Sequence, residues 1–357
     1  MTKKVLLKGN EIMAEAAIQA GCRFYAGYPI TPQNEVPEYM SRRMPQVDGT
    51  FIQAESEIAA INMLFGASAA GARCMTSSSS PGISLKQEGI SYIAAGELPC
   101  VIANVQRGGP GLGNIRASQA DYFQSVKGGG HGDYRLIVLA PSTLPEMYQL
   151  TMNAFDYADY YRNPVLILSD GILGQMAEPV ELLPYEPIFD LPEKDFLLDG
   201  CAGRKPRIVR TLFLHPADSL AKHNLLLQEK YAKICEELQL VEQVQTEDAD
   251  LVIAAYGITA RIGRQALDMA RKEEMKVGLI RPITLWPFPE RAFKELAETI
   301  EKFLVVEMSN GQFIEDVKLA TECKKPVEFL GLGGGWYPTP ENIFEKICAV
   351  YEKSPCK

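Results

Sequence analysis

The first half of the chain alternates between helical and strand patterns of apolar positions. Apolar residues recur every three or four positions over residues 10–20 and 56–70, and each run ends at a glycine, which predicts two helices. Further helices are predicted from residue 82 to about 95 and over 145–160. Short apolar runs predict strands at 23–26, 50–53, 73–76, 99–105, 136–139 and 164–168. This β–α alternation predicts a parallel sheet with helices on both faces.

In the second half, an irregular segment interrupts the alternation of helices and strands, which then resumes. Prolines at positions 179, 184, 187, 192 and 206 predict an irregular connector, and residues 217–242 read as one long amphipathic helix. From residue 250, strands are predicted at 251–255, 277–281, 303–306 and 327–330, with helices at 260–273 and 290–301. We therefore expect an α/β domain at 1–185, a connector with a long helix at 186–247, and a smaller α/β domain at 248–357.

Length and composition narrow the class of protein. A chain of 357 residues is long for one hydrophobic core, and 46% hydrophobic with 23% charged residues is typical of a globular protein. A net charge of −9 argues against nucleic acid as the main partner, because phosphate binding needs a basic surface. The N-terminal apolar run is short and ends at Lys8, so we expect neither a secretory signal nor a membrane span, and a cytoplasmic location.

The eight cysteines lie at positions 22, 74, 100, 201, 235, 323, 348 and 356, and none forms a C-x-x-C pair. Iron–sulfur clusters and zinc sites normally show close cysteine pairs. We therefore expect no cluster or zinc on this chain, and reduced cysteines that serve packing.

Four polar or glycine-rich segments directly follow predicted strands of the first half. They are residues 28–32, 53–57, 77–82 and 106–114. Ligands of open parallel sheets bind at the carboxyl ends of the strands, so these segments are expected to line one crevice.

Three side chains in these segments are candidates for chemistry, and each also has a structural interpretation. Thr31 stands beside Pro32, which favours Thr31 as the N-cap of a helix, a place that also attracts anions. Glu57 falls in the first turn of a helix, where it either complements the helix dipole or projects into the crevice for proton transfer. Arg107 precedes a glycine-rich turn and either binds a carboxylate through two parallel hydrogen bonds or forms a structural ion pair.

Three further features of the sequence indicate a functional site less specifically. Ser80 and Pro81 predict a second N-cap with proline at the first helical position. His131, in a glycine-rich loop, is either a catalytic base or part of a surface loop. The glycines at 331–335 predict a turn against a neighbour, and the chain contains no P-loop, no complete dinucleotide fingerprint, no nucleophile elbow and no H-E-x-x-H motif.

Taken together, the motifs resemble the alpha subunit of 2-oxoacid:ferredoxin oxidoreductases, which are thiamine-diphosphate and iron–sulfur enzymes. The matching segments are G-Y-P-I-T-P at 27–32, E-S-E-I-A-A at 55–60, N-V-Q-R-G-G-P at 104–110, S-D-G at 169–171 and R-P-I-T-L-W-P at 281–287. Segments 53–56, 77–89 and 128–134 are most similar to the branched-chain, 2-oxoisovalerate type, and the 2-oxoglutarate type is a near relative. The resemblance implies a pyrimidine-binding-type first domain and a second domain like the C-terminal domain of transketolase.

The resemblance also implies that the chemistry is divided between chains. The magnesium–diphosphate motif G-D-G with a following asparagine is missing, and S-D-G at 169–171 imitates it only in part. A thiamine-binding beta subunit is therefore expected to hold the diphosphate and Mg²⁺. A gamma subunit and a ferredoxin-like delta subunit are also expected, with [4Fe–4S] clusters on the other subunits, coenzyme A as co-substrate and a dimer of heteromers. The gamma domain that some relatives fuse is not expected on this chain.

The same resemblance implies a role for each of the three candidate side chains, Thr31, Glu57 and Arg107. Glu57 matches the glutamate that hydrogen-bonds the aminopyrimidine ring of thiamine, with Tyr28 and Pro29 beside the cofactor and Glu55 flanking the site. Thr31 and Arg107 match the residues that hold the substrate carboxylate. The implied reaction is oxidative decarboxylation of a branched-chain 2-oxoacid to acyl-CoA, with electrons passed to ferredoxin. Two alternatives stay open. The first is a 2-oxoglutarate enzyme, whose longer, charged substrate would need a further cation in the pocket, such as Arg116 or Arg135. The second is a non-catalytic α/β binding or assembly subunit.

Overall fold

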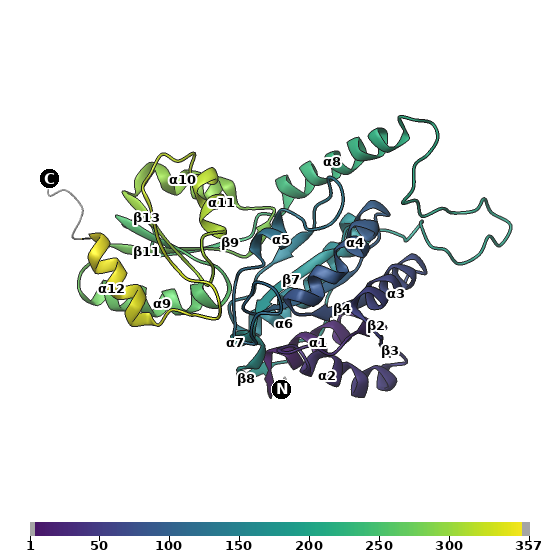
Figure 1. Ribbon diagram of the computed structural model, residues 1–357, viewed down its shortest axis with the longest axis horizontal. Helices are drawn as coiled ribbons and strands as arrows, with labels where there is room; N and C mark the ends of the chain where they lie inside the picture. The colour runs from purple at the N-terminus through teal and green to yellow at the C-terminus, as the bar shows by residue number, and fades with distance from the viewer. Residues whose placement is uncertain (1–3, 352–357) are drawn as a thin grey trace.

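Two sheets, each covered by helices, form the body of the protein (Figure 1). The structure is a computed structural model that describes residues 4–351, so Cys356 and the first three residues lie outside the described part. The larger sheet has the strand order β12-β6-β7-β5-β4-β2-β3. Its strands are β2 (Phe24–Gly27), β3 (Thr50–Gln53), β4 (Cys74–Ser78), β5 (Val101–Gln106), β6 (Ile137–Leu139), β7 (Val165–Asp170) and β12 (Thr284–Trp286).

Every pairing in the larger sheet is parallel except that of β12 with β6. Seven α-helices and one 3-10 helix accompany it: α1 (Gly9–Gln19), α2 (Glu35–Arg43), η1 (Met44–Val47), α3 (Glu57–Ala69), α4 (Ser80–Ala95), α5 (Tyr122–Val126), α6 (Leu144–Tyr161) and α7 (Gly171–Gln175). Successive residues of β5 point to opposite faces of the sheet. Val101 and Ala103 pack in the core with α1, α2 and α6, whereas Ile102 packs in the core with α3 and α4. The predicted doubly covered parallel sheet is confirmed.

The smaller sheet has the order β14-β13-β10-β11-β9, in which only β9 is antiparallel. Its strands are β9 (Val241–Val244), β10 (Leu251–Ala254), β11 (Val277–Pro282), β13 (Lys302–Glu307) and β14 (Val327–Gly331). Its helices are α9 (Gly257–Lys272), α10 (Glu290–Thr299), α11 (Phe313–Ala320) and α12 (Pro340–Tyr351). Helices α9 and α12 share one apolar core, and α10 and α11 belong to the core on the opposite face.

The two sheets are joined by more than the connector. Strand β12 follows β11 of the smaller sheet but pairs with β6 of the larger one. Tyr122 from α5 packs against Tyr256 and Phe313, with ring centroids 5.6 and 5.7 Å away. One hydrophobic core therefore continues from the first unit into the second, and the expected limits of the domains stay a prediction.

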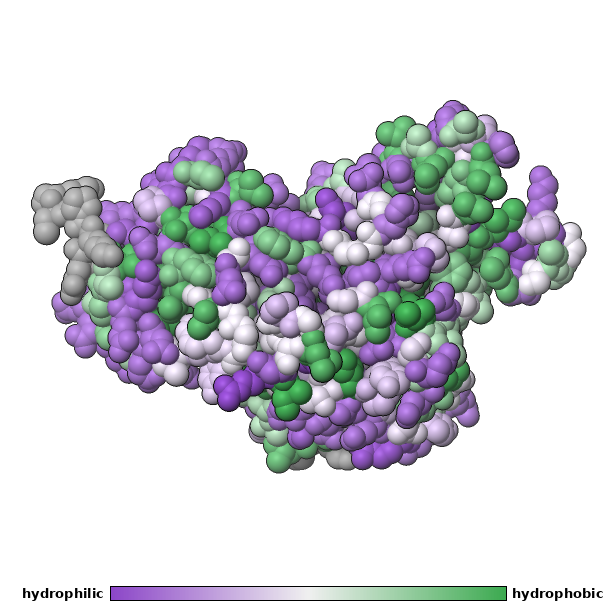
Figure 2. Space-filling model, viewed as in Figure 1, coloured by the Kyte–Doolittle hydropathy of each residue, from purple (hydrophilic) through white to green (hydrophobic). Residues whose placement is uncertain are grey.

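The connector is an apolar projection from the body. Residues 182–218 contain no helix or strand, and with α8 (Ser219–Glu237) they extend beyond the first sheet (Figure 1). Only Leu227, Tyr231 and Ile234 of α8 are buried. Large exposed apolar side chains gather on the connector and α8, as Figure 2 shows at the upper right: Ile208, Leu212, Leu214, Leu220, Leu225 and Leu226. Such a surface is a feature of proteins that associate with other chains.

Several element boundaries differ from the predictions. The long helix predicted to residue 242 ends at Glu237, because Val241–Val244 instead pairs with β11. Ser79, not Ser80, is the N-cap of α4. Strands β1 (Lys4–Lys8) and β8 (Ala177–Glu181), which no pattern predicted, pair with each other as a separate two-stranded sheet. No helix within residues 4–351 combines the length and apolar composition that crossing a bilayer needs.

Candidate active site

The four segments predicted to line a crevice do meet at one edge of the larger sheet. They follow β2, β3, β4 and β5, which are consecutive neighbours in the sheet. A hydrogen bond from the Arg107 backbone N–H to the Ser80 hydroxyl (2.9 Å) joins two of them. The hydroxyls of Tyr25 and Ser77 lie 2.6 Å apart, and Ser77 also donates to the side chain of Gln33. No sequence pattern indicates Gln33, because a single amide in a loop has no periodic signal.

Arg107 is a buried cation without an acidic partner. Its side chain is 7% exposed, and its terminal nitrogens donate to the carbonyl oxygens of Thr31 (3.0 Å) and Leu112 (2.9 Å). Its Nε is buried and has no hydrogen-bond partner in the structure. No carboxylate within residues 4–351 lies within ion-pair distance of it; the nearby Asp121 instead accepts from Ser80 and Asn104. The structural ion pair weighed from the sequence is therefore not formed within this part of the chain.

Thr31 does not cap a helix, and that prediction is wrong. Helix α2 begins at Glu35 with Asn34 as its N-cap, and Thr31 and Pro32 lie in the turn before it. The Pro32 carbonyl accepts hydrogen bonds from the side-chain amides of Asn10 (2.8 Å) and Gln175 (3.0 Å), so it is engaged by tertiary contacts rather than by a helix. The Thr31 hydroxyl accepts a long bond from Asn34 (3.4 Å), and Thr31 lines a cavity.

Glu57 is the first residue of α3, where the Ser56 hydroxyl caps the helix by accepting from the Ala59 N–H (3.2 Å). Its side chain is only 5% exposed, yet its carboxylate accepts no hydrogen bond from any residue in the described part of the chain. Neither carboxylate oxygen is among the fully buried polar atoms that lack a partner, so the carboxylate keeps some contact with solvent.

The first turn of α4 is shaped around Glu57. A Cβ at Gly82 would lie 2.5 Å from Glu57 Oε1 and 2.0 Å from the Ser78 hydroxyl. The hydroxyls of Ser78 and Ser79 are themselves buried without partners. Since Ser80 of the same turn bonds Arg107, and Arg107 bonds Thr31, the three sequence candidates all lie around the N-terminus of α4.

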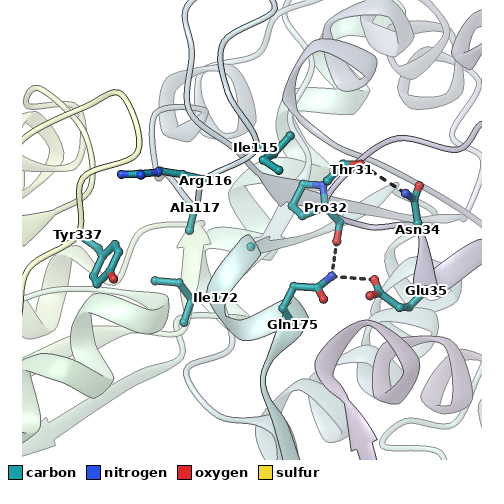
Figure 3. A pocket seen from close by; sticks show the side chains of 11 residues that line it. Thr31, Pro32, Asn34, Glu35, Ile115, Arg116, Ala117, Ile172, Gln175 and Tyr337 are labelled. Carbon is teal, nitrogen blue, oxygen red and sulfur yellow. Dashed lines mark hydrogen bonds between the residues drawn. The ribbon is translucent and has the colours of Figure 1, made fainter.

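A cavity of 710 Å³ opens beside Thr31 (Figure 3). In Figure 3, Arg116 and Tyr337 lie on one side of it, with Thr31 and Pro32 on the other. Arg116 therefore lines this cavity, whereas Arg135 lines a separate one. The remaining wall is formed by Asn34, Glu35, Ile115, Ala117, Gly171, Ile172 and Gln175.

The glycine-rich segment at 331–335 forms a turn against the first unit of the same chain. The Asn114 side-chain amide donates to the Gly334 carbonyl (2.9 Å), and a Cβ at Gly335 would lie 2.7 Å from Cβ of Arg116. This turn holds the segment that carries Arg116 and places Tyr337 at the cavity. No sequence pattern indicated that partner.

The other predicted positions are peripheral. Tyr28 and Pro29 are exposed at the end of β2. His131 is exposed and lines a cavity of 140 Å³ with Tyr92 and Phe213, not the cavity beside Thr31. The buried cysteines Cys22, Cys74 and Cys100 are free thiols, and no group of three or more potential metal ligands occurs within residues 4–351.

Comparisons with known proteins identify the class. Residues 15–243 match the domain family described as pyruvate flavodoxin/ferredoxin oxidoreductase, thiamine-diphosphate-binding, and residues 249–343 match core domain II of pyruvate:ferredoxin oxidoreductase. The fold is thus that of an oxidoreductase subunit with a thiamine-diphosphate-binding domain. The chain belongs to the 2-oxoacid:ferredoxin oxidoreductase family, as its motifs predicted.

Relatives of nearly equal length support this assignment. The ketoisovalerate oxidoreductase subunit VorB of Methanothermobacter marburgensis is 51% identical over 349 residues, 98% of each chain. The 2-oxoglutarate synthase subunit KorA of Methanothermobacter thermautotrophicus is 38% identical over 377 residues, 97% of this chain and 99% of the relative.

Solved structures agree on the fold. The chain superposes on a 2-oxoglutarate:ferredoxin oxidoreductase from Magnetococcus marinus, bound to 2-oxoglutarate, coenzyme A and succinyl-CoA, with a TM-score of 0.86 and 28% identity. That match covers 98% of this chain and 65% of the other. A split-gene transketolase matches with a TM-score of 0.60 at 13% identity, covering 96% and 97%, and shows likeness of fold alone. The predicted fold class of two thiamine-enzyme-like domains is confirmed.

Proposed function

We propose that this chain is the alpha subunit of an enzyme that oxidatively decarboxylates a branched-chain 2-oxoacid, 2-oxoisovalerate, to its acyl-CoA and passes the electrons to ferredoxin. The observation that carries the proposal is the arrangement of two buried residues around the N-terminus of α4. Within the described residues, the Glu57 carboxylate has no hydrogen-bond donor and the Arg107 guanidinium has no acidic partner. A ligand that needs both is a cofactor with a polar ring together with a substrate carboxylate.

The residues around Glu57 fit the aminopyrimidine ring of thiamine diphosphate. A heteroaromatic ring with ring nitrogens and an amino group would supply partners for the hydroxyls of Ser78 and Ser79, which have none, and a donor to the Glu57 carboxylate. Glu57 would hold a proton shared with a ring nitrogen. When bound, the cofactor supplies the nucleophile that attacks the keto carbon and the electron sink for decarboxylation.

Arg107 and Thr31 would orient the oxoacid. Thr31 lines the cavity, and the guanidinium of Arg107 bonds the Thr31 carbonyl and lies beside it. Charge-assisted hydrogen bonds to the carboxylate would hold the keto carbon in line for attack.

One part of the wall of the cavity beside Thr31 suits a small apolar substituent. Ile115, Ala117 and Ile172 contribute aliphatic side chains to its wall. A 2-oxoglutarate enzyme is the second candidate, because Arg116 lines the same cavity and could pair with a second carboxylate. The higher identity to VorB (51%) than to KorA (38%) supports the branched-chain substrate.

Partner subunits would complete the site. Exposed apolar side chains flank the crevice at Tyr28, Ile58, Leu112 and Ile115, as at a surface that another chain covers. We propose that a beta subunit binds there and holds the diphosphate with Mg²⁺, and that gamma and ferredoxin-like delta subunits complete a dimer of heteromers. The [4Fe–4S] clusters would lie on those other subunits, since residues 4–351 contain no cluster of metal ligands.

The test is an assay of the reconstituted complex with 2-oxoisovalerate, 2-oxoglutarate and pyruvate. We expect the highest kcat/KM with 2-oxoisovalerate, a loss of about 10²-fold or more in kcat for Glu57→Gln, and wild-type activity for Glu55→Gln as the matched control. Arg107→Ala should mainly raise KM for the oxoacid. Full activity of Glu57→Gln would remove its role, and a complex inactive with all three oxoacids would favour a non-catalytic subunit.

A further inference from the structure

The segment between β5 and α5 contains a loop whose shape depends on contacts from outside it. Arg107 and Ala117 pair as an antiparallel bridge at its base, and residues 108–116, the glycine loop, lie between them. Glycines occupy positions 108, 109, 111 and 113. Because glycine has the greatest backbone freedom of all residues, such a sequence has little preference for one conformation. The contacts that order the glycine loop therefore decide where its backbone atoms lie.

The glycine loop supplies one of the two bonds that orient the Arg107 side chain. Nη2 of Arg107 donates to the carbonyl oxygen of Leu112 in this loop (2.9 Å), and Nη1 donates to the carbonyl oxygen of Thr31 (3.0 Å). A guanidinium group is planar and rigid, so two fixed acceptors determine the direction of its remaining N–H groups. The position of Leu112 therefore helps to determine how Arg107 meets a carboxylate.

Asn114 joins the glycine loop to the second unit. Its side-chain amide donates to the carbonyl oxygen of Gly334 (2.9 Å), and its Oδ1 accepts from the backbone N–H of Arg116 (2.9 Å). Its backbone N–H donates to the carbonyl oxygen of Gly108 (2.8 Å). One residue thus bonds both ends of the loop and a turn of the other unit.

The turn that receives Asn114 packs closely against the loop and is itself anchored. A Cβ at Gly108 would lie 3.1 Å from the backbone nitrogen of Gly335, so the two backbones approach more closely than a side chain readily allows. Oδ1 of Asn310 accepts from the backbone N–H of Gly333 (2.9 Å), which holds the turn to the segment after β13. The second unit therefore offers the glycine loop a fixed support.

We propose that Asn114 is a positioning residue for oxoacid binding, because it holds the glycine loop against the second unit. The held loop fixes the Leu112 carbonyl and thereby the direction of the Arg107 guanidinium. The inference rests on the proposed role of Arg107 in binding the substrate carboxylate. The smaller unit then takes part in substrate binding, although the three candidate side chains all lie on the larger one.

The surface position of Asn114 makes this role separable from folding. Asn114 is exposed, and its bond to Gly334 lies at the surface. Surface substitutions usually change stability little, so losing this bond should loosen the loop without unfolding the chain. The net contribution of one hydrogen bond corresponds to a change of about two- to tenfold in a binding constant.

The first test compares KM and kcat of the reconstituted complex with 2-oxoisovalerate. Asn114→Ala should raise KM about two- to tenfold and change kcat by less than about twofold, because it weakens ground-state and transition-state binding alike. Asn310→Ala, at the other end of the same tie, should raise KM as well. Asn153→Ala is the matched control: it loses an exposed bond from Gln149 on α6 (2.9 Å), and its KM should match the wild type.

A double variant shows whether Asn114 acts through Arg107. Because Arg107 is the group that Asn114 positions, Asn114→Ala should not raise KM further in the Arg107→Ala complex. A further rise of about twofold or more would overturn the proposal, since Asn114 would then act on the substrate by another route.

Hydrogen–deuterium exchange of the full chain follows the loop without reference to activity. The backbone amides of residues 108–116 should exchange faster in Asn114→Ala and Asn310→Ala than in the wild type, and at the wild-type rate in Asn153→Ala. Equal exchange in the wild type and all three variants would overturn the proposal, because the tie would then not hold the loop.

The two hypotheses fail in different ways. An Arg107→Ala complex with a wild-type KM would overturn the proposed role of Arg107 and the inference with it. A raised KM for Arg107→Ala together with a wild-type KM for Asn114→Ala would overturn only the positioning by Asn114.

Discussion

Replacing Gly82 by alanine should separate catalysis from folding, because the added methyl group enters the space that Glu57 and Ser78 occupy. The new Cβ would lie 2.5 Å from Glu57 Oε1, so an ordinary contact of 3.4 Å requires the carboxylate to move by about 0.9 Å. Displacements of about 1 Å at a reacting group cost about 10²-fold in rate. We therefore expect kcat to fall about 10²-fold.

The stability of the Gly82→Ala chain should change little. Both side chains that meet the new methyl group are flexible, so overpacking should cost no more than about 1–2 kcal/mol. The better helix propensity of alanine offsets up to about 1 kcal/mol of that cost. Thermal unfolding of the chain and kcat of the complex with 2-oxoisovalerate measure the two effects separately.

Two controls sharpen the assay. Gly66→Ala lies on α3, where a Cβ meets no atom within 4 Å, so it should add about 0.5–1 kcal/mol of stability and leave kcat unchanged. Gly82→Ala combined with Ser78→Ala removes the shorter contact but not the one with Glu57, so activity should stay low. A Gly82→Ala complex with more than half the wild-type kcat would refute the reasoning, because Glu57 would then tolerate displacement.

Two further predictions concern stability. The Arg281 guanidinium, 6% exposed, bonds Glu146 of α6 (2.8 Å) and Glu242 of β9 (2.8 Å), so Arg281→Ala should destabilise the chain by about 3–5 kcal/mol in urea unfolding, and a loss below about 1 kcal/mol would contradict the prediction. Burial raises the pKa of Asp170 to about 6, so its contribution to stability is fully present below pH 3.8 and is lost as the pH rises through about 6. Melting temperatures of wild type and Asp170→Asn from pH 4 to 7 check this, and a difference that does not vary with pH would show the assignment to be wrong.

Much of the fold was predictable because apolar periodicity reports burial directly. Strands such as Val101–Gln106 are buried on both faces, so they read as continuous apolar runs between amphipathic helices. The short strands β1, β8 and β12 were not predictable. Each pairs with a segment far away in sequence, and Thr284–Trp286 joins the sheet of the other unit, which no local pattern records.

For the candidate site, the sequence by itself determined which side chains follow the strands and therefore share one edge of the sheet: Thr31, Glu57 and Arg107. Only the tertiary structure decided how far each of these side chains is buried and which hydrogen bonds it forms. The Thr31 turn is held by contacts to Pro32 rather than by a helix, Glu57 is a largely buried residue, and Gly82 of α4 packs against its carboxylate. The physical reason is that local periodicity indicates where the strands and helices lie along the chain, whereas burial and hydrogen-bond partners depend on which distant segments pack together.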